Sequence, residues 1–266
     1  MPVAVDLIQE EFDEVIEKSL RRSQKRKLKR QQYNNKKQLV DIEVIKPRTE
    51  TQYYVFDAFD NGDNLLLHGV AGTGKTFISL YLALDDIFNG EDMKRSVTIV
   101  RSVVPTRDMG FLPGKETEKT AVYEQPYMAM CRELTGRGDG YDILKQRGIV
   151  NFTTTSYIRG ITLDDTIIIV DECQNMTFHE LDSIITRVGE NTRIIFCGDF
   201  RQTDLTKPYD QSGIKEFMHI LENMKSFSGF EFDHEDIVRS GLVKDYIIAK
   251  DNISDNTSYA SIRKNI

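Results

Sequence analysis

The sequence predicts an α/β fold in which a mostly parallel sheet is flanked by helices. Two continuous apolar runs, residues 166–170 and 193–197, are typical of strands buried on both faces of a parallel sheet. A segment with helical spacing, residues 178–188, lies between them. A third apolar run, residues 64–68, ends in a glycine-rich loop before the helix-compatible residues 77–88. Strands that alternate with helices in this way predict a doubly wound sheet with right-handed crossovers.

The remaining elements fit between these runs. The sequence predicts a helix over residues 51–59, a strand over 96–102, a helix over about 127–134 and a short strand over 152–157. The glycines of residues 136–140 predict a flexible break.

Composition places the chain among globular proteins. Its 266 residues are 39% hydrophobic and 29% charged, and no apolar run approaches the length of a membrane span. The three cysteines are far apart and form no C-x-x-C pair, which argues against a disulfide framework and a zinc site. We therefore expect a cytoplasmic protein that has no membrane partner.

Charge and proline content predict three parts: a charged N-terminal helix or arm over residues 1–47, a core over 48–250, and a polar, disordered tail over 251–266. The first part carries 11 Lys/Arg and 8 Asp/Glu within a chain of net charge −7. Its basic half is either an arm that binds nucleic-acid phosphates or a charged helix that docks a partner or none.

The glycine-rich loop predicts a phosphate-binding site. It follows the G-x-x-x-x-G-K-T pattern of the P-loop, with a strand before it and a helix after it. Its glycines allow backbone N–H groups to point at phosphate oxygens, while the lysine reaches the β- and γ-phosphates and the threonine hydroxyl binds Mg²⁺. The predicted cofactors are ATP and Mg²⁺, and the predicted binding residues are Gly69, Val70, Ala71, Gly72, Thr73, Gly74, Lys75 and Thr76.

Two acids predict the second half of the site. Asp171 and Glu172 follow a buried strand, at the end of a parallel sheet where ligands bind. We expect Asp171 to hold Mg²⁺ and Glu172 to deprotonate the attacking water. After the next strand, Gln202 is positioned to contact the γ-phosphate or that water. Glu172 and Gln202 favour hydrolysis over a kinase reaction.

Phosphoryl transfer also uses a cation against the charge of the transition state. Arg239 is the candidate, and Arg201, Arg159 and Arg101 compete with it.

From about residue 51 to residue 249 the sequence resembles the PhoH family of P-loop ATPases, which is related to the motor domain of superfamily 1 helicases. The matching elements, beyond the P-loop, are Val100-Arg-Ser-Val-Val-Pro-Thr-Arg107, Gly110-Phe-Leu-Pro-Gly114, Gln125-Pro-Tyr127, Ile158-Arg-Gly160, Val170-Asp-Glu-Cys-Gln-Asn-Met-Thr177, Gly198-Asp-x-x-Gln202 and Asp236-Ile-Val-Arg-Ser240. Cys173 stands where the family usually has alanine.

The resemblance implies a single RecA-like P-loop NTPase domain that hydrolyses ATP, with catalytic roles for Lys75, Glu172, Gln202 and Arg239. It implies that Gln174 couples the nucleotide to nucleic acid and that Gln52 reads the adenine.

One motor domain leaves the arginine to come from the same chain or from a neighbour. We expect the second arrangement, a ring-shaped homo-oligomer such as a hexamer that moves on or remodels RNA or single-stranded DNA. The alternatives are a slow nucleotide-dependent switch that docks a protein partner without nucleic acid, and a small-molecule kinase.

Overall fold

A computed structural model describes residues 40–89, 96–102, 116–158, 160–200 and 208–263. The chain divides into two units, residues 1–41 and residues 42–266, and the second unit is described here. The N-terminal helix that the sequence predicts lies outside the described residues.

Six strands form one sheet in the order β3-β2-β4-β5-β1-β6, and each adjacent pair is parallel. The predicted α/β fold with its parallel sheet is therefore confirmed. Strand β5 separates β1, which leads into the P-loop, from β4, which leads into the two acids, as in RecA-like domains. The strands are β1 Asn64–Gly69, β2 Ser96–Arg101, β3 Val150–Thr154, β4 Thr166–Asp171, β5 Arg193–Gly198 and β6 Phe227–Phe232.

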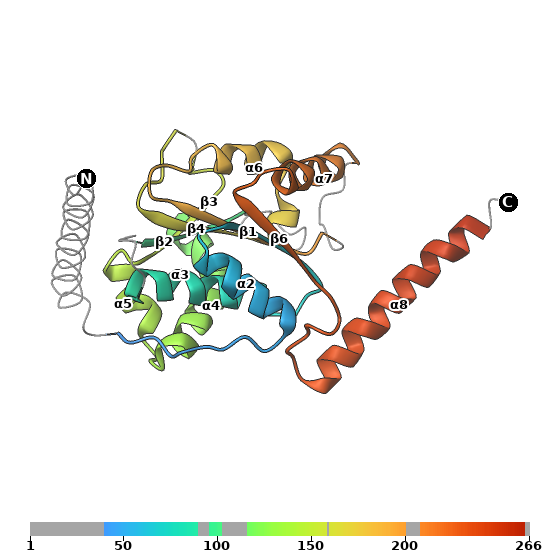
Figure 1. Ribbon diagram of the computed structural model, residues 1–266, viewed down its shortest axis with the longest axis horizontal. Coiled ribbons are helices and arrows are strands. Elements are labelled where there is room, and N and C mark those ends of the chain that lie inside the picture. Colours follow the sequence, from blue (N-terminus) through green and yellow to red (C-terminus); the bar gives the residue numbers. More distant parts are fainter. Residues whose placement is uncertain (1–39, 90–95, 103–115, 159, 201–207, 264–266) are drawn as a thin grey trace, which may run out of the picture. The chain divides into compact units, whose positions relative to one another are not determined.

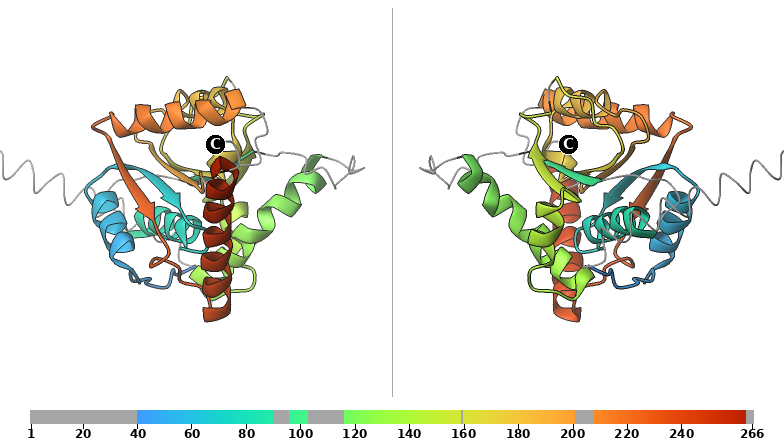
Figure 2. Two further views of the ribbon diagram at one scale, coloured as in Figure 1. Left: turned by 90° about the vertical axis from the view of Figure 1, so that its right-hand side faces the viewer. Right: turned by 90° about the vertical axis from the view of Figure 1, so that its left-hand side faces the viewer.

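Helices cover both faces of the sheet (Figures 1 and 2). One face carries α2 Glu50–Asp60, α3 Lys75–Asn89, α4 Glu116–Thr135 and α5 Gly140–Gln146. The other carries α6 Phe178–Ile185 and α7 Pro208–Glu222, which contact each other. A short 3₁₀ turn, Cys173–Asn175, joins β4 to α6.

The central strands are apolar because both of their faces are covered. Side chains of β4 alternate: Ile168 and Val170 belong to the core under α6 and α7, together with Phe196 and Phe217. Every residue of β4 is buried, and Ile167 points to the opposite face, where α3 contacts the strand. Each fully buried side chain of this size contributes roughly 1.5–3 kcal/mol to folding.

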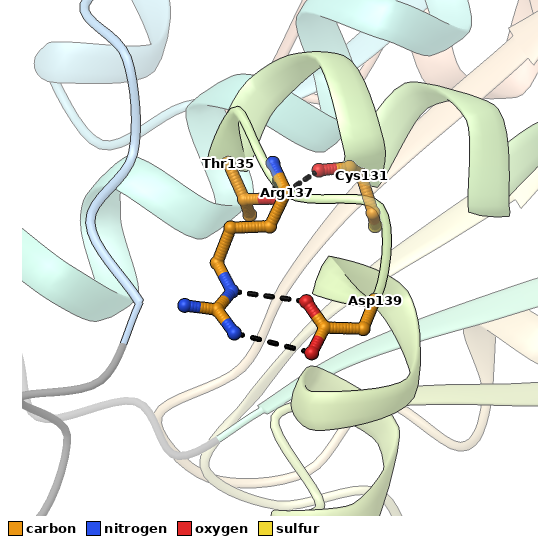
Figure 3. A network of polar contacts seen from close by, with 4 residues as sticks. All are labelled: Cys131, Thr135, Arg137 and Asp139. Atoms are coloured by element: carbon orange, nitrogen blue, oxygen red, sulfur yellow. Dashed lines mark hydrogen bonds and ion pairs between the residues drawn. The ribbon is translucent and has the colours of Figure 1, made fainter.

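The connection between α4 and α5 is a defined turn, although the sequence predicts a flexible break over residues 136–140. Gly136 takes a positive φ of 64° after the last residue of α4. Arg137 then donates to both carboxylate oxygens of Asp139, at 3.0 and 3.1 Å (Figure 3). Thr135 donates to the Cys131 carbonyl at 2.7 Å, so the end of α4 is held by its own side chains.

The C-terminal part differs from the sequence prediction. Helix α8 runs from Gly241 to Arg263, and it leads away from the sheet (Figure 1). Residues 251–263, which were expected to form a disordered tail, are thus helical. Among the described residues, no helix is both long and apolar enough to cross a membrane.

Candidate active site

The P-loop begins at a glycine that no other residue could replace without strain. Gly69 has a φ of 114°, and a Cβ on it would lie 2.1 Å from the carbonyl oxygen of Phe232. The next residue, Val70, donates its N–H to that same carbonyl at 2.9 Å. Strand β6 therefore fixes the start of the loop, and a side chain at position 69 would push the two apart.

Lys75, the first residue of α3, is folded back onto the loop. Its ammonium group donates to the carbonyl oxygens of Gly69 at 2.9 Å and Val70 at 2.7 Å, and to the Thr73 hydroxyl at 3.3 Å. Only 9% of the residue is exposed. Burial lowers its pKa, and the nearby carboxylate of Asp199 acts in the opposite direction. The lysine is thus held inside the loop, where a phosphate could replace the carbonyl oxygens.

Thr76 and Asp171 meet at the end of the sheet. The Thr76 hydroxyl donates to Oδ1 of Asp171 at 2.7 Å, so the two predicted metal ligands are brought together. A hydroxyl and a carboxylate beside a phosphate-binding loop fit Mg²⁺, which takes one or two protein oxygens together with water and substrate phosphates. No group of three or more His, Cys, Asp or Glu side chains within the described ranges could hold a metal ion.

Asp171 is a buried carboxylate with two defined partners. Thr76 occupies Oδ1, and the hydroxyl of Tyr127 donates to Oδ2 at 2.6 Å. Burial raises the pKa of Asp171, while these two hydrogen bonds lower it because they favour the charged form.

Glu172 follows Asp171 in a left-handed conformation, with a φ of 53°. Such a conformation is uncommon outside glycine and is concentrated at functional sites. Gln174 donates to Oε2 of Glu172 at 2.6 Å and accepts the backbone N–H of Asp199 at 3.1 Å. The predicted base is therefore tied, through one buried amide, to the end of strand β5.

Gly198 provides the space for this arrangement. A Cβ at that position would lie 2.7 Å from the sulfur of Cys173 and 3.0 Å from the side-chain oxygen of Gln174. Gly198, the last residue of β5, thus leaves the room that Cys173 and Gln174 occupy.

Gln52 lies on α2 and supports the P-loop. Its amide nitrogen donates to the Thr73 carbonyl at 3.0 Å, and its amide oxygen accepts the N–H of Arg48 at 2.9 Å. Both ends of the side chain therefore bind the protein itself. The predicted adenine contact stays a prediction.

Arg239 lies beside the P-loop of its own chain. A Cβ on Gly72 would lie 3.0 Å from Cγ and 3.8 Å from Nε of this arginine, and the N–H of Val238 donates to the Gly72 carbonyl at 3.2 Å. The segment is anchored by Asp236, a buried carboxylate that accepts the Thr51 hydroxyl at 3.0 Å. Of the competing arginines, Arg101 stacks on the ring of Tyr123 at 5.8 Å.

Several predicted residues cannot be placed. Gln202, Arg201, Arg159 and the Gly110-Phe-Leu-Pro-Gly114 element lie outside the described residues.

Two side chains at the site had no role in the sequence analysis. Tyr127 was recognised only as part of a Gln-Pro-Tyr element. Glu180 accepts the Thr155 hydroxyl at 2.7 Å and the Thr177 N–H at 2.9 Å, and so ties the end of β3 to the start of α6. The Thr-x-x-Glu spacing of a capping box could have identified Glu180, since Thr177 is the N-cap of α6.

The chain is similar in sequence to a known protein family over the residues that form this site. The family model described as PhoH-like protein matches residues 44–250. A PhoH-like protein of Bacillus subtilis (strain 168) is 33% identical over 207 residues, which cover 78% of this chain and 64% of that protein. Protein PhoH of Escherichia coli (strain K12) is 32% identical over 203 residues, covering 76% and 57% respectively. The chain thus spans less than two thirds of the length of either relative.

Solved structures show weaker likenesses. The large terminase of the thermophilic bacteriophage D6E gives a TM-score of 0.44 at 15% identity, covering 76% of this chain and 50% of that one. Unliganded Pif1 from Bacteroides sp gives 0.35 at 14% identity, covering 74% and 43%. The order of the strands in the sheet gives the fold.

Proposed function

Because this chain belongs to the PhoH-like protein family, we propose that it binds Mg²⁺ and ATP and hydrolyses ATP. The observation that carries this proposal is the meeting of Thr76 with Asp171 at the P-loop, with Glu172 as the next residue. A hydrolase needs these groups at one end of the sheet, and two separate segments of the chain supply them there.

Different residues of the chain bind the phosphates, hold the metal and activate the water. The backbone N–H groups of the P-loop and the Lys75 ammonium bind the β- and γ-phosphates. Thr76 and Asp171 would hold Mg²⁺, which when bound would neutralise charge on those phosphates. Glu172 orients the attacking water and accepts its proton, while Gln174 donates to Oε2 of the same carboxylate.

The test of this function is a set of matched variants. Purified wild-type chain should hydrolyse ATP only with Mg²⁺ present. Lys75→Ala should lose ATP binding, while Glu172→Gln should keep binding and lose hydrolysis. Glu133→Gln, which changes an exposed acid of α4, is the control and should behave as wild type. Hydrolysis that survives in Glu172→Gln would reject this assignment of the base.

For the cation, the structure supports the arrangement within one chain. A single motor domain predicts an arginine supplied across a subunit interface. Arg239 instead packs against Gly72 of its own P-loop, so a nucleotide held there would have this guanidinium beside it without a second chain. We therefore assign Arg239 to the site of its own chain.

Gln52 has one further proposed role. Its amide lies 3.0 Å from the P-loop carbonyl of Thr73, and an adenine could exchange for the Arg48 contact. In that case Gln52→Ala should weaken ATP binding more than GTP binding. An equal loss for both nucleotides would leave Gln52 with only its loop-supporting role.

We further propose that RNA or single-stranded DNA stimulates ATP hydrolysis by this chain. It is supported by Gln174, whose one side chain joins the Glu172 carboxylate to the backbone after β5. A change at the β5 end that pulls on Gln174 would therefore also free or restrain the base. The alternative, a slow switch that docks a protein, requires hydrolysis that is indifferent to both polymers.

Assembly into a ring is a separate proposal. Helix α8 exposes the large apolar side chains of Leu242, Tyr246 and Ile253, which association between copies would cover. Light scattering of the purified chain with ATP and Mg²⁺ tests it, and the mass of a monomer would reject it.

A further inference from the structure

Tyr127 is a buried tyrosine whose hydroxyl contacts Asp171, a residue of the site. It lies on α4, only 1% of it is exposed, and its hydroxyl donates to Oδ2 of Asp171 at 2.6 Å. From this position the hydroxyl is directed at the carboxylate and away from solvent. Its contribution to the reaction must therefore pass through Asp171.

The two oxygens of Asp171 have different tasks. Oδ1 faces the Thr76 hydroxyl at 2.7 Å, on the side of the P-loop, while Oδ2 faces Tyr127. A carboxylate with a partner on each oxygen cannot rotate about its Cβ–Cγ bond without breaking a hydrogen bond. Without the phenol, Oδ2 would be a buried acceptor that lacks its partner, and the group would turn toward other donors.

The phenol itself is firmly held. Its ring packs against Phe152 of β3 at a centroid distance of 5.8 Å, and α4 contacts both α3 and α5. Burial and the charge of Asp171 raise the pKa of Tyr127, so the hydroxyl stays protonated and acts as a donor.

We propose that Tyr127 is a positioning residue for the magnesium ligand Asp171, and that its hydroxyl aims Oδ1 at the metal site beside Thr76. This inference rests on the proposed function, because it requires a Mg²⁺–nucleotide complex at the P-loop. It separates Mg²⁺ affinity from nucleotide affinity, since the phenol hydroxyl donates to the metal ligand Asp171.

The chain offers a matched control in Tyr141 of α5. This buried tyrosine also donates to a carboxylate, Oε2 of Glu124, at 2.7 Å, and Lys145 donates to the same oxygen. Tyr141→Phe therefore removes a comparable hydrogen bond from the same α4–α5 region, away from the magnesium ligands.

The experiment measures binding of a fluorescent ADP to the full chain, first in EDTA and then across a Mg²⁺ titration. Tyr127→Phe should bind ADP in EDTA like the wild type and should need about tenfold more Mg²⁺ for half of the magnesium effect, as expected for one lost hydrogen bond to a charged group. Tyr141→Phe should follow the wild-type titration.

Four outcomes would overturn the proposal. A wild-type Mg²⁺ titration for Tyr127→Phe would show that the hydroxyl does not act on the ligand. Loss of ADP binding in EDTA, or an equal shift in Tyr141→Phe, would show a general effect on the fold. If the wild-type chain itself shows no Mg²⁺ effect, the failure lies in the proposed function, and the inference falls with it.

Discussion

Gln174 donates a hydrogen bond of 2.6 Å to the carboxylate of Glu172, two residues before it. The same amide accepts the N–H of Asp199 at 3.1 Å, so the acid after β4 and the backbone after β5 share one buried side chain. This bond uses one acceptor site on Oε2, and a carboxylate has about four such sites, so Glu172 can still accept a proton from water. We propose that a ligand that moves Gln174 changes the orientation of this carboxylate.

Gln174→Ala tests this link. The variant should bind ADP normally, but the ratio of its hydrolysis rates with and without single-stranded polymer should fall about tenfold or more, since the lost bond is to a charged group. The comparison is steady-state ATP hydrolysis beside Gln146→Ala, an exposed glutamine at the end of α5. An unchanged ratio in Gln174→Ala would contradict the link.

Gly69→Ala should lower the free energy of unfolding by at least about 2 kcal/mol, because the new methyl group meets the Phe232 carbonyl and φ is 114°. Gly229→Ala, in strand β6 with no atom within 4 Å of the added Cβ, should change it little. Urea unfolding followed by circular dichroism measures both. Equal stabilities for the two variants would show that β6 yields at this contact.

Arg239→Ala should reduce hydrolysis at least tenfold, as a cation beside the phosphates requires. Because Arg239 lies beside its own P-loop, mixing this variant with Lys75→Ala chains should restore no activity. Recovery of hydrolysis in the mixture would place the arginine in a neighbouring subunit, as the sequence analysis preferred.

The three cysteines are free and buried, and they should react slowly with a thiol reagent at pH 8. Burial raises the pKa of the Cys131 thiol to about 12, so its reactive thiolate is scarce in the folded chain. In the unfolded chain the pKa returns to about 8.5, so this group's contribution to stability is full below that pH and is lost as the pH rises from there toward 12. Labelling with and without denaturant checks the prediction, and rapid native labelling would contradict it.

The buried strands and the P-loop could be predicted from the sequence because their signals are local. Strand β4 is apolar throughout, and the G-x-x-x-x-G-K-T spacing fixes a backbone shape. Strand β6 was missed, since Phe227–Phe232 is only partly buried at the edge of the sheet and contains a glycine.

The contacts that complete the site could not be predicted, because each joins residues far apart in the chain. Tyr127 reaches Asp171 across 44 positions, and the Arg239 side chain packs against Gly72 through the fold alone. A family element such as Gln-Pro-Tyr marks the position without giving the partner. The partner follows from the packing of α4 against the sheet.

Steady-state ATP hydrolysis by the full chain, with and without single-stranded RNA or DNA and beside Glu172→Gln, tests the central claim most directly. We predict Mg²⁺-dependent hydrolysis that one of the polymers stimulates and that Glu172→Gln abolishes at every polymer concentration. Hydrolysis that neither polymer changes would contradict the coupling and favour the nucleotide-dependent switch, and no hydrolysis at all would contradict the ATPase assignment itself.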